Sequence, residues 1–233
     1  MTTPPAASHP ALPWLLLLLS MTTGLVDAIS VLGLGKVFTA NMTGNIVFLG
    51  FAAAGAPGFK PIPYVVAIAA FLIGATIAGR TSKAHLGKPL RRWLITASVI
   101  EAGLLWTAAL VAIGFDVASQ SPSPRLFVII ALTAIAMGFR NATIRQLKVP
   151  DLTTTVLTLT LTGLAADSSL AGGANPNWRR RVGGVLAILA GSALGAVLVI
   201  QTGLVIPLLL AGGLVMAGTI ACSLHPASAQ PAG

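Results

Sequence analysis

The chain has 233 residues, of which 55% are hydrophobic and only 8% are charged, and its mean hydropathy is +0.91. Soluble domains average roughly 25% charged residues, so this composition excludes a water-soluble globular protein. The net charge of +9 does not indicate a nucleic-acid partner, because the Lys and Arg residues lie between apolar segments, where they report membrane orientation.

Eight apolar blocks follow one another along the chain. A membrane-spanning helix needs about 20 apolar residues, and the second and sixth blocks are shorter than that and polar at their starts. We expect a single transmembrane domain over 14–221, with disordered tails at 1–13 and 222–233. In chain order, the blocks are 14–34, 40–56, 62–79, 93–114, 126–144, 152–166, 182–201 and 203–221.

The two halves of the chain resemble each other weakly at a spacing of 114 residues. The segment from Gly24 to Ala28 matches the segment from Gly138 to Ala142, and Phe38-Thr39 matches Leu152-Thr153. This similarity predicts two repeats, one over 14–114 and the other over 126–221.

The distribution of charge distinguishes two topologies. If all eight blocks span the membrane, the 14 Lys and Arg residues divide nine to five between its sides. If the two short blocks enter and leave on the same side, the division is eleven to three, which follows the positive-inside rule far better. The sequence therefore favours an all-α polytopic transmembrane bundle of two inverted three-span repeats, each with a short or re-entrant helix. Eight spanning helices in same-direction repeats are the alternative.

Ionisable residues inside the apolar blocks are the first candidates for a functional site. A charged group at membrane depth is costly and usually faces a cavity or a partner. Asp27 is expected to couple a proton or ion, to bind a cationic substrate, or to make a structural contact, and Glu101 is expected either to be functional in proton coupling or to make a structural contact. The structural partner of Asp27 would be Arg140 or Lys36, and a protonated Glu101 would bond to a neighbouring helix. Arg140 is either part of the site or a plain cytoplasmic charge at the end of its block.

Neutral polar residues complete the predicted site. Asn141 occupies the position equivalent to Asp27. The residues that open block 40–56 would receive an anion at a helix start or cap the helix. The predicted substrate- or ion-binding residues are Asp27, Asn41, Thr43, Asn45, Glu101, Arg140, Asn141 and Thr155.

Histidine and cysteine provide no basis for a metal site or for catalysis. The single cysteine, Cys222, excludes an intrachain disulfide and a cysteine metal cluster. The three histidines are scattered without ligand spacing. We therefore expect no metal, no cofactor and no enzymatic activity.

The polar motifs of the chain resemble those of the YoaK family of uncharacterised bacterial membrane proteins, over nearly the whole region between the tails. The resemblance implies an integral inner-membrane protein and little about activity. The segments that carry it are 24–28, 38–45 with Gly50, 138–142, 151–155 and Thr162-Gly163.

The function that these features favour is a small secondary transporter or permease with a polar site near the membrane midplane. A non-catalytic membrane scaffold or partner subunit is the main alternative, and a lipid-acting membrane enzyme is a weaker one. The expected location is the bacterial cytoplasmic membrane, with several spans and both termini in the cytoplasm. The expected partners are membrane lipid and an unidentified small solute or ion, and a homo-oligomer is left open.

Overall fold

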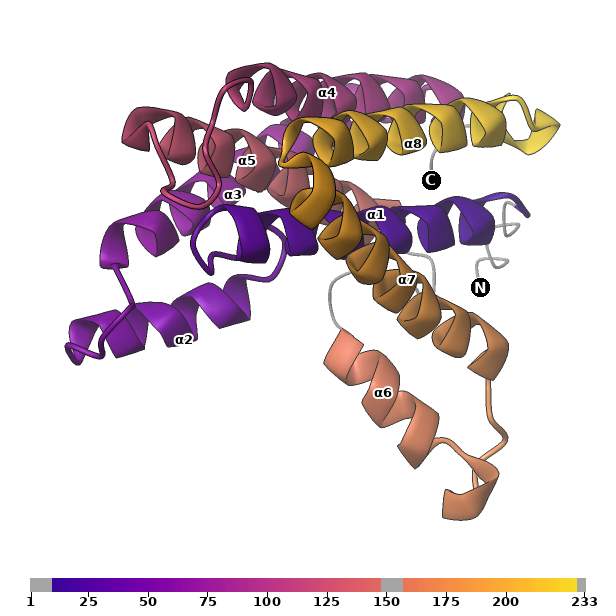
Figure 1. Ribbon diagram of the computed structural model, residues 1–233. Helices are drawn as coiled ribbons and strands as arrows, with labels where there is room; N and C mark the ends of the chain where they lie inside the picture. Colours follow the sequence, from indigo (N-terminus) through magenta and orange to yellow (C-terminus); the bar gives the residue numbers. More distant parts are fainter. Residues whose placement is uncertain (1–9, 148–156, 230–233) are drawn as a thin grey trace.

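The computed structural model describes residues 10–147 and 157–229, and this part of the chain contains eight α-helices, one for each predicted apolar block (Figure 1). The predicted all-α polytopic bundle is confirmed, and no described residue belongs to a β-strand. The helices are α1 (Leu12–Gly33), α2 (Met42–Ala53), α3 (Pro61–Ala84), α4 (Leu90–Val111), α5 (Ser123–Leu147), α6 (Leu157–Ala166), α7 (Trp178–Thr202) and α8 (Val205–Ser223).

Helix length separates six spanning helices from two short ones. The six long helices, α1, α3, α4, α5, α7 and α8, have 19 to 25 residues and are apolar enough to cross a membrane. The other two, α2 and α6, have 12 and 10 residues, and at 1.5 Å per residue they extend for only about 18 and 15 Å. The hydrocarbon core of a bilayer is about 30 Å thick, so these lengths fit the six-span prediction and not the eight-span alternative.

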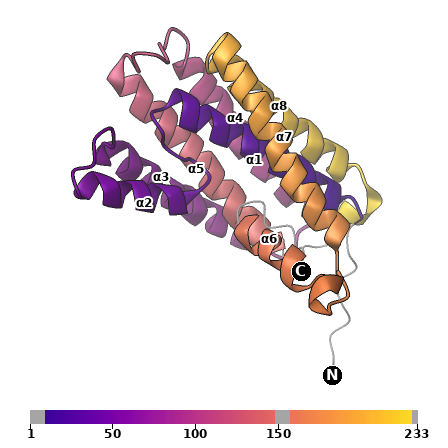
Figure 2. The same ribbon diagram turned by 60° about the horizontal axis from the view of Figure 1, so that its bottom comes forward.

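The long helices form two groups that are joined along α4 and α8. In one group α1 packs against α7 and α8, and in the other α5 packs against α3 and α4. The most buried spans are α1 and α5, in each of which 61% of an apolar 18-residue stretch is buried, against 22% for α7. The short helices lie outermost, α2 against α3 and α6 against α7 (Figure 2).

Glycines bring the backbones of crossing helices into direct contact. At the crossing of α1 and α7, a Cβ on Gly24 would collide with the Ile188 carbonyl oxygen, and one on Gly191 would collide with that of Met21. At the crossing of α5 and α3, Gly138 meets the carbonyl of Phe71 in the same way. Gly74 likewise meets the carbonyl of Ile135. Small residues permit this close approach, and van der Waals packing drives helix association where no water is present.

The chain turns back after α1 before it enters α2. Gly35 and Lys36 have positive φ angles of 85° and 61°, which reverse the chain at the end of α1. The end of α1 and the start of α3 lie at one end of the bundle, with α2 between them in the chain (Figure 1). The start of α1 and the end of α8 lie at the opposite end.

The described part of the C-terminal tail is more ordered than the sequence suggested. A disordered segment was expected from residue 222, but α8 continues to Ser223 and a 3-10 turn follows at Pro226–Ala229. The Ser228 hydroxyl is buried and donates to the carbonyl of Ser223, which holds this turn against the end of the helix. Residues 1–9 and 230–233 of the predicted tails lie outside the described residues.

Candidate functional site

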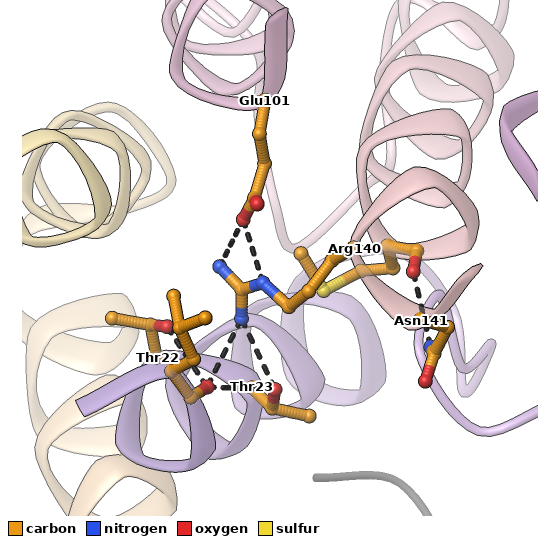
Figure 3. A network of polar contacts seen from close by, with 7 residues as sticks. Thr22, Thr23, Glu101, Arg140 and Asn141 are labelled. Atoms are coloured by element: carbon orange, nitrogen blue, oxygen red, sulfur yellow. Dashed lines mark hydrogen bonds and ion pairs between the residues drawn. The ribbon is translucent and has the colours of Figure 1, made fainter. Parts of the chain in front are cut away.

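A buried ion pair links α4 and α5. Arg140 is 1% exposed and Glu101 is 4% exposed. The Arg140 Nε donates to Glu101 Oε1 at 2.6 Å, and a terminal guanidinium nitrogen pairs with the same oxygen (Figure 3). Arg140 is therefore a buried, paired charge and not a plain cytoplasmic one, and Glu101 has found its partner on another helix.

The same guanidinium also reaches α1. Its remaining terminal nitrogen donates to the carbonyl of Leu19 at 3.1 Å and to the hydroxyl of Thr23 at 3.0 Å. That hydroxyl in turn donates to the Leu19 carbonyl at 2.8 Å. Arg140, which lies on α5, thus connects three spanning helices, because one edge of its guanidinium bonds to α4 and the other edge bonds to α1 (Figure 3).

Asp27 lies on α1, one turn beyond Thr23, and does not join this network directly. Its Oδ1 is buried and has no hydrogen-bond partner among the described residues. The backbone N–H of Ala40 and the positive charge of Arg140 are the groups that act on its carboxylate. A buried carboxylate oxygen without a donor is expensive, which makes Asp27 a place where a proton or a ligand would bind.

A pocket of about 370 Å³ collects three of the other predicted residues. Asn41 and Thr43, at the start of α2, line it together with Asn141 on α5. Two residues in the middle of α3, Phe71 and Ala75, form another wall, so α2 begins beside the middle of a spanning helix. Asn41 stands at the N-cap position but makes no capping bond with its side chain. The Asn141 amide nitrogen donates to the carbonyl of Met137, within α5.

Asn45 has a different environment. It is fully buried, and its amide pairs with the backbone of Phe38: its oxygen accepts from the N–H at 2.9 Å and its nitrogen donates to the carbonyl at 2.5 Å. This pairing imitates a β-ladder and fixes the segment before α2. The rings of Phe38, Phe48 and Tyr64 pack around the same segment. The Asn45 side chain therefore uses its polar atoms internally.

The structure thus divides the predicted residues into separate groups. Glu101 and Arg140 form the ion pair, Asn41, Thr43 and Asn141 line the pocket, and Thr155 lies outside the described residues. Sequence reasoning missed Thr23 and the pocket residue Arg145. A signal for Thr23 existed, since Thr22-Thr23 interrupts a leucine-rich run. Among the described residues, no group of three or more His, Cys, Asp or Glu side chains is placed to hold a metal ion.

Comparison with known proteins identifies the family. A family model described as "Protein of unknown function (DUF1275)" matches residues 15–221. The chain is also 33% identical, over 155 residues, to the "UPF0700 transmembrane protein YoaK" of Bacillus subtilis (strain 168). That match covers 66% of each protein, just under two thirds of the relative's length. No solved structure matches the chain. The chain is a multi-pass membrane protein that is similar to YoaK, and it belongs to the DUF1275 family.

Proposed function

We propose that the protein is a small secondary transporter or permease of the bacterial cytoplasmic membrane. The observation that carries this proposal is the start of α2, which lies beside the middle of α3 and opens onto a mainly apolar pocket that Asn41, Thr43 and Asn141 also line. Discontinuous helices that begin at membrane depth are how many transporters place backbone and side-chain polar groups around a solute. The unpartnered carboxylate oxygen of Asp27 supports proton or ion coupling as part of the same mechanism.

An inverted repeat is part of the proposal. Exchanging α1 with α5, α3 with α7 and α4 with α8 leaves the pattern of helix contacts unchanged. The close glycine contacts obey the same exchange, because Gly24 on Ile188 corresponds to Gly138 on Phe71. Each half contains three spanning helices, an odd number, so equivalent helices cross the membrane in opposite directions. Such a pair of halves supports alternating access by rocking one half against the other.

The charge distribution supports a cytoplasmic location for both termini. Lys36, Lys60 and Arg125 are the basic residues near the end of the bundle where α3 begins. The remaining described Lys and Arg residues, apart from the buried Arg140, lie toward the end where α1 begins and α8 ends. By the positive-inside rule, that end faces the cytoplasm.

Two measurements test the proposal. Single cysteines at Pro57→Cys and Ala174→Cys, on a Cys222→Ala background, are probed with a membrane-impermeant thiol reagent. Inverted repeats require labelling of Pro57→Cys from outside and of Ala174→Cys from inside. Labelling of both from the same side would overturn the inverted arrangement.

The second measurement is flux in proteoliposomes that contain a pH-sensitive dye and are challenged with a panel of small solutes. A coupled transporter acidifies or alkalises the lumen with at least one solute, and Asp27→Asn loses that response while it remains folded. Identical behaviour of Asp27→Asn, the wild type and empty liposomes across the panel would favour the scaffold alternative.

A further inference from the structure

The chemistry of the pocket at the start of α2 is one-sided. Its ten lining residues include one basic side chain, Arg145, and no acidic one. The other polar groups that line it are the neutral side chains of Asn41, Thr43 and Asn141. Amides and hydroxyls donate hydrogen bonds as readily as they accept them. The single formal charge in the lining is therefore positive, and the same lining also contains three neutral side chains that can donate.

Three other arginines have side-chain or backbone partners, and Arg145 differs from them in having none among the described residues. Arg140 is neutralised by Glu101, and Arg181 pairs with Asp167. Arg125 donates to the carbonyl of Ile113. Arg145 lies in the last turn of α5, is exposed, and makes no ion pair or side-chain hydrogen bond with a described residue. Its five donors are consequently available to a ligand in the pocket.

At the corresponding positions of the other repeat, an acidic residue is present and the basic residue is absent. Asp27 takes the place of Asn141, and Val31 takes the place of Arg145 at the same spacing of 114 residues. The acid is thus found on α1 and the free base on α5. If the acid binds a proton while the base binds a monovalent anion, the charges of the two ligands cancel. Such a site suits proton-coupled uptake of an anion.

We propose that the pocket between α2, α3 and α5 binds a small anion through a carboxylate or phosphate group, and that Arg145 provides the charge that selects it. This inference rests on the proposed transport function and names its substrate class. A volume of about 370 Å³ lies at the small end of the range for ligand pockets, about 300–1,000 Å³. A planar guanidinium suits both groups, since it bonds to two of their oxygens at once. A free solute and an anionic lipid headgroup share this chemistry.

The test measures binding, independently of flux. The protein is placed in nanodiscs of phosphatidylcholine alone and titrated with inorganic phosphate and with acetate at constant ionic strength. Binding is followed by the shift in apparent melting temperature. Arg145→Gln is expected to weaken binding about tenfold or more, and Thr43→Val is expected to weaken it by a smaller factor. Arg92→Gln is the matched control, because Arg92 is also exposed but does not line the pocket.

A parallel arm separates the two sources of the anion. Nanodiscs that contain phosphatidylglycerol are compared with the neutral ones. If neither soluble anion binds, but phosphatidylglycerol raises the melting temperature of the wild type and not of Arg145→Gln, the site is an anion site that a lipid headgroup occupies. If neither probe shows a dependence on Arg145 or Thr43, the inference is overturned.

The outcomes also distinguish this inference from the proposed function. Arg145-dependent binding in a protein that moves no solute would overturn transport and leave the anion site in place. Solute-dependent flux that Asp27→Asn abolishes, without any Arg145-dependent binding, would leave transport in place and overturn the anion site.

Discussion

The two groups of long helices, α1 with α7 and α8 and α5 with α3 and α4, pack alike but carry different charges. At both crossings, α1 with α7 and α5 with α3, paired glycines let a helix backbone meet a carbonyl of its neighbour. The side chains beside those crossings differ. Arg140 on α5 pairs with Glu101 on α4, whereas the equivalent positions on α1 and α8, at the spacing of 114 residues, are Val26 and Val215. The contact between α1 and α8 is therefore closed by apolar residues at the two positions where the contact between α5 and α4 has the ion pair.

This difference indicates that the ion pair is not needed for this kind of helix packing. A buried ion pair is weak support for stability, because desolvating two charges costs about as much as their attraction returns. The contact between α1 and α8 shows that apolar residues fill the equivalent place, since Val26 and Val215 are both buried. Packing alone does not explain why α5 carries a charge at membrane depth. The role of the ion pair can be tested by replacing it with the apolar residues of the equivalent contact.

The largest expected effect comes from removing one partner of the ion pair. Arg140→Val leaves the Glu101 carboxylate buried without its partner, and the expected loss in the free energy of unfolding is about 3–5 kcal/mol. The measurement is an SDS titration of purified protein in mixed micelles. A variant as stable as the wild type would show that the pair contributes nothing to the fold even when it is broken.

The double variant Glu101→Val with Arg140→Val sharpens the comparison. It transfers the residues of the contact between α1 and α8, and we expect it to recover stability to within about 1 kcal/mol of the wild type. If the pair serves transport, the recovered protein will still lack flux in proteoliposomes. A double variant as unstable as Arg140→Val would mean that the two crossings are not interchangeable.

Glycine substitution tests whether the crossings depend on close approach. A Cβ at position 191 would collide with the backbone carbonyl of Met21, whereas one at Gly213 meets nothing within 4 Å. Gly191→Ala should cost about 1–3 kcal/mol through overpacking. Gly213→Ala should be neutral or stabilising by up to about 1 kcal/mol, because alanine favours the helix. Apparent melting temperatures in detergent should move in opposite directions, and equal shifts would contradict the crossing geometry.

The short helices give a further comparison. Asn45 holds the segment before α2 by two bonds to Phe38, while its counterpart on α6 is Leu159, which is 68% exposed. Asn45→Leu removes both bonds and leaves the backbone groups of Phe38 unpaired, at an expected cost of about 1–3 kcal/mol. Asn41→Leu is the control, because Asn41 is exposed and makes no capping bond. Similar losses in the two variants would show that Asn45 is not a specific anchor.

The sequence predicted the architecture better than it predicted the contacts. Apolar block length and the positions of Lys and Arg were sufficient for six long and two short helices, because bilayer thickness and the positive-inside rule act on single segments. Asp27 and Glu101 were identified as costly at membrane depth for the same reason, whereas for Arg140 a plain cytoplasmic charge stayed an alternative. Which of them pair was not predictable, since Glu101 and Arg140 are 39 residues apart and their distance depends on how α4 packs against α5. The use of Asn45 by Phe38 likewise depends on the turn at Gly35 and Lys36.

The smallest expected effect concerns the tie between α6 and α7. Arg181 donates to Asp167 at 2.7 Å, but the Asp167 side chain is 45% exposed. Exposed ion pairs contribute about 0–1 kcal/mol, and salt screens them. Asp167→Asn should therefore lower the melting temperature only slightly, and the difference should shrink further at about 1 M salt. A loss as large as that of Asn45→Leu would mean that α6 is anchored as firmly as α2, and the contrast between the two short helices would disappear.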